Sequence, residues 1–274
     1  MKTTDHTRPL RVLVNGFLGK MGSMTVHAIN SQPDMVVAGG FDPASTTTTV
    51  VLESREPAPA FTDLDSAIST CSPDVMVDFT LPGAVEDNVR VALARQLDTV
   101  VGTSGLDRQR LEQLMTTATD DTAVFVAPNF SIGALLMMEA SRQAARYFTD
   151  VEILEFHHNN KVDAPSATAI ATAEALAAVR QQAHLRSQAP DALSELPDFA
   201  GARGANVFGI PVHSLRSDGF MAAQEVVFGS PGQTLSIRHD VIDRRAYMPG
   251  VLLAIRSVGT LKGLVIGLEE LMEP

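Results

Sequence analysis

The sequence predicts an α/β protein whose first half forms a parallel, doubly wound sheet and whose second half is organised differently. Short, continuously apolar segments alternate with amphipathic segments along the first half. A glycine-rich turn, Gly16-Phe-Leu-Gly19-Lys-Met-Gly22, separates the first apolar segment from the first helical one. In the second half this alternation gives way to successive strand-like runs joined by turn residues. Buried strands alternating with helices are typical of a parallel sheet covered on both faces.

In the first half we expect five buried strands with helices between them. The expected strands are Leu10–Asn15, Met35–Phe41, Asp74–Phe79, Thr99–Gly102 and Ala123–Ala127. The expected helices are Lys20–Asn30, Ala84–Gln96 and Arg108–Thr117. The segment Ala44–Pro59 is rich in Thr, Pro and charge, so it is expected to be a long surface loop.

In the second half we expect helices and strands in a less regular order, around a polar stretch over residues 181–204. The expected helices are Ile132–Phe148, Ser166–Arg180 and Val251–Leu261. The expected strands are Val151–Phe156, Val207–Arg216, Ala222–Phe228, Thr234–Ile242 and a short one near the end. The turn signals SDG and SPGQ join the three middle strands, which predicts a meander of hairpins.

Composition limits the possible functions. The chain has 274 residues and 29.2 kDa, with 45% hydrophobic and 19% charged residues, which suits two small folded domains and excludes global disorder. A net charge of −11 argues against a broad surface for nucleic acid or an anionic membrane. Cys71 is the only cysteine, and no apolar run approaches the roughly 18 to 20 residues of a membrane span. We therefore expect a cytoplasmic protein.

The glycine turn is the first candidate site. Glycines between a strand and a helix allow the backbone to approach a pyrophosphate, which the helix N-terminus also attracts. The spacing is GxxGxxG, and a tight turn that only packs helix on sheet is the alternative. Asp42 follows the second strand, where an acid can bind the adenosine ribose, although an ordinary loop carboxylate would look the same. No Arg or Lys follows closely to bind a 2′-phosphate, so NADH should serve at least as well as NADPH.

Two further turns follow strands at the edge where open α/β sheets bind ligands. They are Gly102-Thr-Ser-Gly105 and Ala127-Pro-Asn-Phe-Ser131. Their small and hydroxylic residues suit the ribose and nicotinamide end of a dinucleotide. Read alone, both are also compatible with plain turns.

The stretch from Glu155 to Ala169 carries the strongest chemical signal. His157, His158 and Lys161 lie in the turn after a strand, and histidine is well suited to proton exchange at neutral pH. Pro165 and Ser166 are typical of a helix start, whose amides would receive a carboxylate opposite Lys161. Capping of the helix is the alternative role for Ser166. A metal site is disfavoured because no HxxxH pair or cysteine partner is present.

At these residues the sequence resembles the dihydrodipicolinate reductase family, whose signature reads E-x-H-H-x-x-K-x-D-A-P-S-G-T-A. The signature extends from Glu155 to Ala169, with Ala167 in place of the glycine. Other shared motifs occur in the same order along residues 10 to 270. They are GxxGxMG at Gly16–Gly22, DFT-x-P at Asp78–Pro82, GTTG at Gly102–Gly105 with Ser104 replacing a threonine, A-x-NFS at Ala127–Ser131, RG at Arg203-Gly204, and I-x-H…R at Ile237, His239 and Arg244.

The resemblance implies a Rossmann-like dinucleotide-binding domain from residues 1–130 and 241–274. Residues 131–240 would form an α+β domain with a mixed, mostly antiparallel sheet that binds substrate and builds a homotetramer. The implied catalytic residues are His157, which gives or takes a proton, and Lys161, a proton donor. The expected substrate residues are His158, Ser166, Ala167 and Thr168. The expected cofactor residues are Gly16, Phe17, Leu18, Gly19, Lys20, Met21, Asp42, Gly102, Thr103, Ser104, Ala127, Pro128, Asn129, Phe130 and Arg244.

The implied reaction is the NAD(P)H-dependent reduction of 4-hydroxy-tetrahydrodipicolinate, a small dicarboxylate, to tetrahydrodipicolinate on the diaminopimelate route to lysine. An acid and a cation beside a conjugated imine suit this chemistry. A related reductase of another cyclic imine or unsaturated small carboxylate is one alternative. A silent nucleotide-sensing or scaffold protein is another, and the presence of both His157 and Lys161 argues against it.

Overall fold

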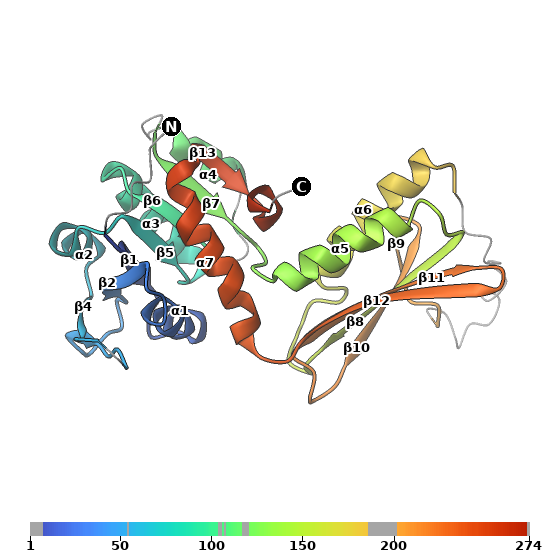
Figure 1. The fold of residues 1–274 in the computed structure, drawn as a ribbon, viewed down its shortest axis with the longest axis horizontal. Helices are drawn as coiled ribbons and strands as arrows, with labels where there is room; N and C mark the ends of the chain where they lie inside the picture. The colour runs from blue at the N-terminus through green and yellow to red at the C-terminus, as the bar shows by residue number, and fades with distance from the viewer. Residues whose placement is uncertain are drawn as a thin grey trace. The chain divides into compact units, whose positions relative to one another are not determined.

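The computed structural model describes residues 8–53, 55–103, 106, 108–116, 121–185 and 202–272. The chain divides into two units (Figure 1). The first unit takes Met1–Ser131 together with Tyr247–Pro274, and the second takes Ile132–Ala246. The chain therefore leaves the first unit once and returns to it near the C-terminus.

The first unit is built on an eight-stranded sheet with the order β13-β7-β6-β5-β1-β2-β4-β3. Its strands are β1 (Leu10–Asn15), β2 (Met35–Phe41), β3 (Thr49–Val50), β4 (Ala58–Phe61), β5 (Val75–Asp78), β6 (Asp98–Val101), β7 (Ala123–Val126) and β13 (Gly263–Ile266). All pairs are parallel except β3 with β4. Strands β5, β6 and β7 are buried at every position, as expected for the centre of a sheet covered on both faces.

Helices cover both faces of this sheet (Figure 1). They are α1 (Lys20–Asn30), α2 (Leu64–Cys71), α3 (Pro82–Ala94), α4 (Arg108–Met115) and α7 (Met248–Ser257). Helices α1 and α7 pack together, while α2, α3 and α4 follow one another in contact. Leu13 and Met76 from the sheet are fully buried in one cluster with Ala67 of α2 and Ala92 of α3. The Rossmann-like, doubly wound arrangement expected from the sequence is confirmed.

The order of strands reverses at β1, which has β2 on one side and β5 on the other. Ligands of doubly wound sheets bind beyond the carboxyl ends of the strands at such a reversal. The turn that begins at Gly16 directly follows β1, so the fold places the glycine turn at this position.

The second unit has a five-stranded mixed sheet with the order β12-β11-β8-β10-β9. Its strands are β8 (Asp150–His157), β9 (Ala205–Val207), β10 (Ile210–Arg216), β11 (Ala222–Ser230) and β12 (Gln233–Val241). Only β8 and β10 pair in parallel. Helices α5 (Ile132–Ala144) and α6 (Ala167–Gln182) pack against this sheet, where Ile153, Leu176 and Val226 are fully buried in one core (Figure 1). This confirms the expected mixed, mostly antiparallel sheet.

Three expectations about the elements were wrong. The segment Ala44–Pro59 is not only a loop, because it contains β3 and the start of β4. The run Val207–Arg216 is broken at Phe208 and Gly209, which both have positive φ and turn β9 back onto β10. The SDG turn does not close a hairpin, since β10 and β11 lie on opposite sides of β8.

The helices also differ from expectation at their ends. The expected Val251–Leu261 helix begins earlier, at Met248, and its α-helical part ends at Ser257, before a short 3₁₀ turn over Val258–Thr260. Helix α5 ends at Ala144, four residues before the expected end. Helix ends fray and tighten, so sequence periodicity defines them poorly.

Candidate active site

The glycine turn after β1 is tightly folded on its own backbone. Gly16 has φ +72°, and a Cβ there would lie 2.7 Å from the carbonyl oxygen of Phe79. A Cβ on Gly22 would lie 2.1 Å from the carbonyl oxygen of Gly16. Any side chain at these positions would have to displace backbone atoms. The glycines therefore bring α1 close to β1.

The first turn of α1 has backbone amides that could donate hydrogen bonds to a ligand. Its N-cap residue is Gly19, which provides no side-chain cap, and the first turn holds no acidic residue. The first amides of a helix have no intrahelical acceptor and carry the positive end of the helix dipole. Leu18, Gly19 and Lys20 are exposed around them. This arrangement fits a pyrophosphate group.

Phe17 was expected among the cofactor residues, but the residue is buried, with 6% of its surface exposed. Its ring packs against Gly40 of β2 so closely that a Cβ on Gly40 would lie 2.7 Å from the ring. Phe17 thus presents its backbone, not its ring, at the turn.

Asp42 lies half-buried just beyond the end of β2. Its Oδ1 accepts a hydrogen bond from the amide of Ala44 at 2.9 Å, and its own amide donates to the carbonyl of Phe61 at 3.0 Å. These bonds hold the carboxylate at the carboxyl edge of the sheet, where the sequence placed it.

A buried carboxylate, Asp78, joins the loops that follow β5 and β6. Its Oδ1 accepts from the amide and hydroxyl of Thr80 at 3.0 and 2.6 Å and from the hydroxyl of Thr103 at 3.3 Å. Its Oδ2 accepts from the amides of Asn88 at 2.8 Å and Asn15 at 3.2 Å. Asn15 ends β1, so one side chain ties the ends of three neighbouring strands together.

Gly102 and Thr103 are part of this arrangement. The amide of Gly102 donates to the carbonyl of Asp78 at 2.9 Å. A Cβ on Gly102 would lie 2.1 Å from the ring of Phe79, so any side chain there would force that ring to move. Ser104, expected beside them, lies outside the described residues.

The turn after β7 is held by its own side chains. Asn129 accepts a hydrogen bond from the amide of Ser131 at 2.9 Å, and Ala127 donates to the carbonyl of Val101 at 3.0 Å. Phe130 is buried and meets the ring of Phe79 edge to face, with centroids 6.0 Å apart. Pro128 is exposed. The expected cofactor residues of the turn after β7 therefore lie at the same edge of the sheet as the glycine turn.

In the second unit, β8 carries a buried carboxylate beside a histidine. Glu155 is fully buried, and its Oε2 lies 2.6 Å from Nδ1 of His157, whose side chain is 15% exposed. Burial raises the pKa of Glu155, but the neighbouring His157, Ser214 and Arg216 outweigh this effect and lower that pKa to about 2. Glu155 is therefore an ionised partner for the imidazole ring.

Arg216 and Asp163 connect this pair to Lys161. Arg216 Nη2 donates to Glu155 Oε1 at 2.7 Å and to the carbonyl of Asp163 at 2.8 Å. The Nζ of Lys161 donates to both carboxylate oxygens of Asp163, at 2.7 and 2.9 Å. The Lys161 ammonium lowers the pKa of Asp163. His157 and Lys161, both expected as catalytic, thus belong to one connected group.

The expected substrate residues surround the start of α6. Ser166 is the N-cap of α6, and its hydroxyl accepts from the amide of Ala169 at 3.2 Å, so the capping role is present. Ala167 is exposed and opens the helix, and it is not among the residues with positive φ. Thr168 follows in the first turn of α6. In the turn that precedes the helix, the carbonyl of His158 accepts a hydrogen bond from the amide of Lys161 at 3.1 Å.

Arg244 was expected to help bind the cofactor, and it lies in a 3₁₀ turn over Arg244–Tyr247. The division of the chain groups it with the second unit, apart from the other expected cofactor residues.

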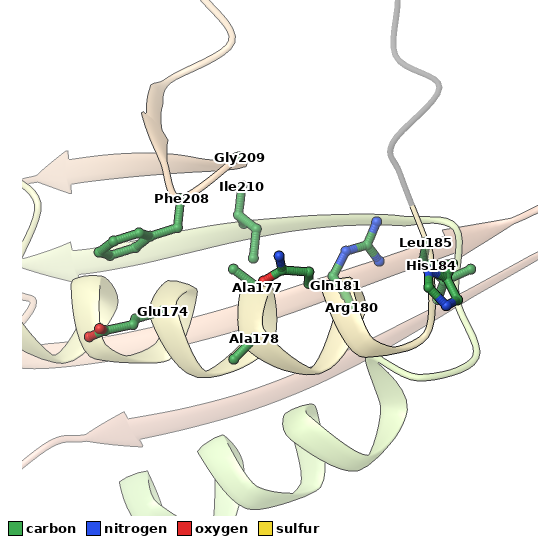
Figure 2. Close-up of a pocket in the computed structure, with 10 residues that line it drawn as sticks. All are labelled: Glu174, Ala177, Ala178, Arg180, Gln181, His184, Leu185, Phe208, Gly209 and Ile210. Carbon is green, nitrogen blue, oxygen red and sulfur yellow. The ribbon is translucent and has the colours of Figure 1, made fainter.

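A cavity of about 1050 Å³ opens elsewhere in the second unit, between α6 and the turn that joins β9 to β10 (Figure 2). It is lined by residues such as Glu174, Gln181 and Phe208, and by none of the candidate site residues.

The described residues contain neither a cluster suited to a metal ion nor a helix suited to a membrane. Within them, no group of three or more His, Cys, Asp or Glu side chains could hold a metal ion. None of the helices that the structure describes is long and apolar enough to cross a membrane.

Sequence reasoning assigned no role to Glu155, Arg216 or Asp78. The sequence could have indicated a role for Glu155. Side chains at positions i and i+2 of a strand share a face, so the E-x-H motif places Glu155 beside His157. The position of Arg216 beside this pair depends on the register between β10 and β8, in which Arg216 lies opposite His157. That register is not readable from the sequence, since β10 and β8 are far apart along it.

Comparison with known proteins decides the family. The model of the N-terminal part of dihydrodipicolinate reductase matches residues 10–130, and the model of its C-terminal part matches residues 133–272. The chain belongs to the dihydrodipicolinate reductase family. The 4-hydroxy-tetrahydrodipicolinate reductase of Synechocystis sp. is 46% identical over 272 residues, covering 95% of this chain and 97% of the relative. That of Enterococcus faecalis is 41% identical over 265 residues, covering 96% and 100%.

Solved structures agree. A dipicolinate-bound dihydrodipicolinate reductase from Paenisporosarcina sp. TG-14 superposes with a TM-score of 0.81 at 38% identity, covering 97% of this chain and 100% of that one. An amine dehydrogenase from Mycobacterium smegmatis, 12% identical with a TM-score of 0.62, shares the fold alone. The resemblance, the fold and the class of oxidoreductase expected from the sequence are therefore confirmed.

Proposed function

We propose that the chain catalyses the reduction of 4-hydroxy-tetrahydrodipicolinate to tetrahydrodipicolinate, with NADH or NADPH as hydride donor, on the diaminopimelate route to lysine. The observation that carries this proposal is the connected group of Glu155, His157, Arg216, Asp163 and Lys161 at the start of α6, in a chain of this family. Curated relatives named for this activity align over nearly the whole chain.

We assign dinucleotide binding to the first unit. The uncapped first turn of α1 and the close approach that Gly16 and Gly22 permit fit a pyrophosphate, and Asp42 fits a ribose. The loops after β6 and β7 would hold the nicotinamide end. When bound, the reduced nicotinamide supplies a hydride.

Substrate binding we assign to the second unit. The amides of the first turn of α6 and the ammonium of Lys161 suit the carboxylates of a small dicarboxylate. Lys161 would exchange Asp163 for substrate, because Asp163 is largely exposed and their ion pair is weak for that reason. To His157 and Lys161 we assign the delivery of the proton that the reduced carbon or nitrogen needs.

Three finer features belong to this proposal. NADH serves at least as well as NADPH, because Asp42 repels a 2′-phosphate. The chain works in the cytoplasm as a homotetramer built through the second sheet. Helices α5 and α6 cover one face of that sheet, and its other face carries Leu154, Phe156 and Leu215, of which Leu215 is 38% exposed.

Ala167 favours one alternative, a reductase of another cyclic imine. The family signature has glycine there, and an added methyl group reduces the room beside a bound carboxylate. The helical backbone at Ala167 does not itself require glycine.

The test is steady-state oxidation of NADH by the purified chain with enzymatically generated 4-hydroxy-tetrahydrodipicolinate. We expect turnover that depends on this substrate and inhibition by dipicolinate. A cyclic imine with a single carboxylate is the comparison substrate. A higher kcat/KM with the monocarboxylate would establish the alternative and contradict the proposal.

A further inference from the structure

Glu155 occupies a position that packing alone does not explain. It is a fully buried carboxylate at the centre of the second sheet, between Ser214 of β10 and Gln224 of β11. Its Oε2 and the Nδ1 of His157 are both buried and lie 2.6 Å apart as an ion pair, and neither atom has a hydrogen-bond partner among the described residues. A buried charge is costly unless it is paired, so the pair with His157 and Arg216 maintains it.

We propose that Glu155 is a positioning residue of the reductase reaction, which holds His157 with a proton on Nδ1 and so makes Nε2 the nitrogen that exchanges protons with substrate. This inference rests on the proposed role of His157.

The tautomer follows from the chemistry of the partner. An ionised carboxylate only accepts hydrogen bonds, so the nitrogen that faces it must carry a proton. Because the pKa of Glu155 is lowered to about 2, the carboxylate stays ionised throughout the range in which the enzyme works. Nδ1 is buried, so the exposed part of the ring lies away from it. A carboxylate that fixes the tautomer and orientation of a histidine has the same role in serine hydrolases.

Arg216 extends this control to the neighbouring turn. One nitrogen of its guanidinium, Nη2, donates both to Glu155 and to the carbonyl of Asp163, whose carboxylate binds Lys161. Within the described residues, the charged groups joined to His157 directly or through this chain of contacts are Glu155 of β8, Arg216 of β10, and Asp163 and Lys161 of the turn. Glu155 therefore positions His157 directly and the Lys161 turn through Arg216.

The test is Glu155→Gln in the full-length enzyme, read by NMR of isotope-labelled histidine and by kinetics. Glutamine keeps the shape, but its amide can donate to Nδ1 and permit the other tautomer. We expect the wild-type His157 signal, assigned with His157→Gln, to show the Nδ1–H tautomer, and the variant to show Nε2–H. We expect kcat to fall by about 10- to 1,000-fold with a much smaller change in the KM for substrate.

Glu152→Gln is the matched control for the NMR measurement. Glu152 lies three residues earlier on β8, on the opposite face, and its Oε2 is 2.7 Å from Nε2 of His213. Its substitution should change the His213 signal and leave the tautomer of His157 unchanged. Where Glu155→Gln fails to fold, Glu155→Asp gives the same readouts, since it keeps the charge and withdraws the carboxylate from Nδ1.

An unchanged His157 tautomer in the folded variant would overturn the inference, and so would a kcat equal to that of the wild type. The NMR readout needs no turnover. If the wild-type protein lacked reductase activity, the proposed function would fail, while the tautomer would still decide whether Glu155 controls the ring.

Discussion

Replacing Asp78 by asparagine is expected to loosen the strand-end loops of the first unit and to weaken NADH binding. The carboxylate is fully buried and accepts hydrogen bonds from side chains or amides of Asn15, Thr80, Asn88 and Thr103. Asparagine has nearly the same shape but replaces one acceptor oxygen with an amide that donates. The substitution therefore tests the hydrogen bonds without creating a cavity.

The magnitude follows from how the new amide can orient. With its oxygen toward Thr80, asparagine keeps the two hydrogen bonds from that residue and turns its nitrogen toward Asn15 and Asn88. Asn15 can adapt by reversing its own amide, because its Oδ1 is buried without a partner. Asn88 is less free, since its Nδ2 also donates to Thr80 Oγ1 at 3.2 Å. The net loss is one hydrogen bond to a charged group, about 1.5–3 kcal/mol.

Urea unfolding followed by circular dichroism measures this loss, and fluorescence titration measures the Kd for NADH. We expect the Kd to rise about tenfold, the equivalent of about 1.4 kcal/mol. Asp65→Asn is the control, because Asp65 forms an exposed ion pair with Arg95 that contributes below about 1 kcal/mol. A loss of stability below about 0.5 kcal/mol together with an unchanged Kd would refute the role given to Asp78.

Further predictions concern the proton donor, the cofactor and pH. Lys161→Ala should lower kcat/KM by about 10²- to 10⁴-fold with little change in the Kd for NADH, and unchanged turnover would remove Lys161 from the mechanism. The ratio of kcat/KM for NADH over NADPH, measured at one ionic strength, should lie between one and about ten, since a screened repulsion at Asp42 contributes only about 1 kcal/mol. A preference for NADPH would contradict this. The pKa of Glu155 is lowered from 4.5 to about 2. The ionised carboxylate therefore contributes about 3 kcal/mol to the free energy of unfolding above pH 5, and this contribution is lost as the pH falls toward 2. Urea unfolding across this range should show that loss in the wild type and not in Glu155→Gln, and parallel curves would argue against it.

Continuous apolar runs made the first sheet readable from the sequence. The expected bounds of β1, β2 and α1 agree with the structure, because each strand is flanked by glycine or polar residues that end the pattern. The two-residue strand β3 was missed, since so short an element has no periodicity to detect. The crossing between β10 and β11 was also missed, because turn residues indicate a turn but not which strands it joins.

The candidate site was partly readable for a similar reason. Local motifs identified the glycine turn and the stretch that contains His157 and Lys161, since their residues are close together in the sequence. Arg216 comes near Glu155 only through the pairing of β10 with β8, and the inward packing of Phe17 depends on Gly40 of β2. Contacts between segments distant in sequence require the fold.

Transfer of deuterium from NADH tests the central claim most directly. The chain is incubated with nicotinamide-4,4-dideuterated NADH and 4-hydroxy-tetrahydrodipicolinate, and the product is analysed by mass spectrometry. The account predicts tetrahydrodipicolinate that carries a single deuterium, formed in proportion to the NADH oxidised. NADH oxidation without labelled tetrahydrodipicolinate, or labelling only of a different imine product, would contradict it.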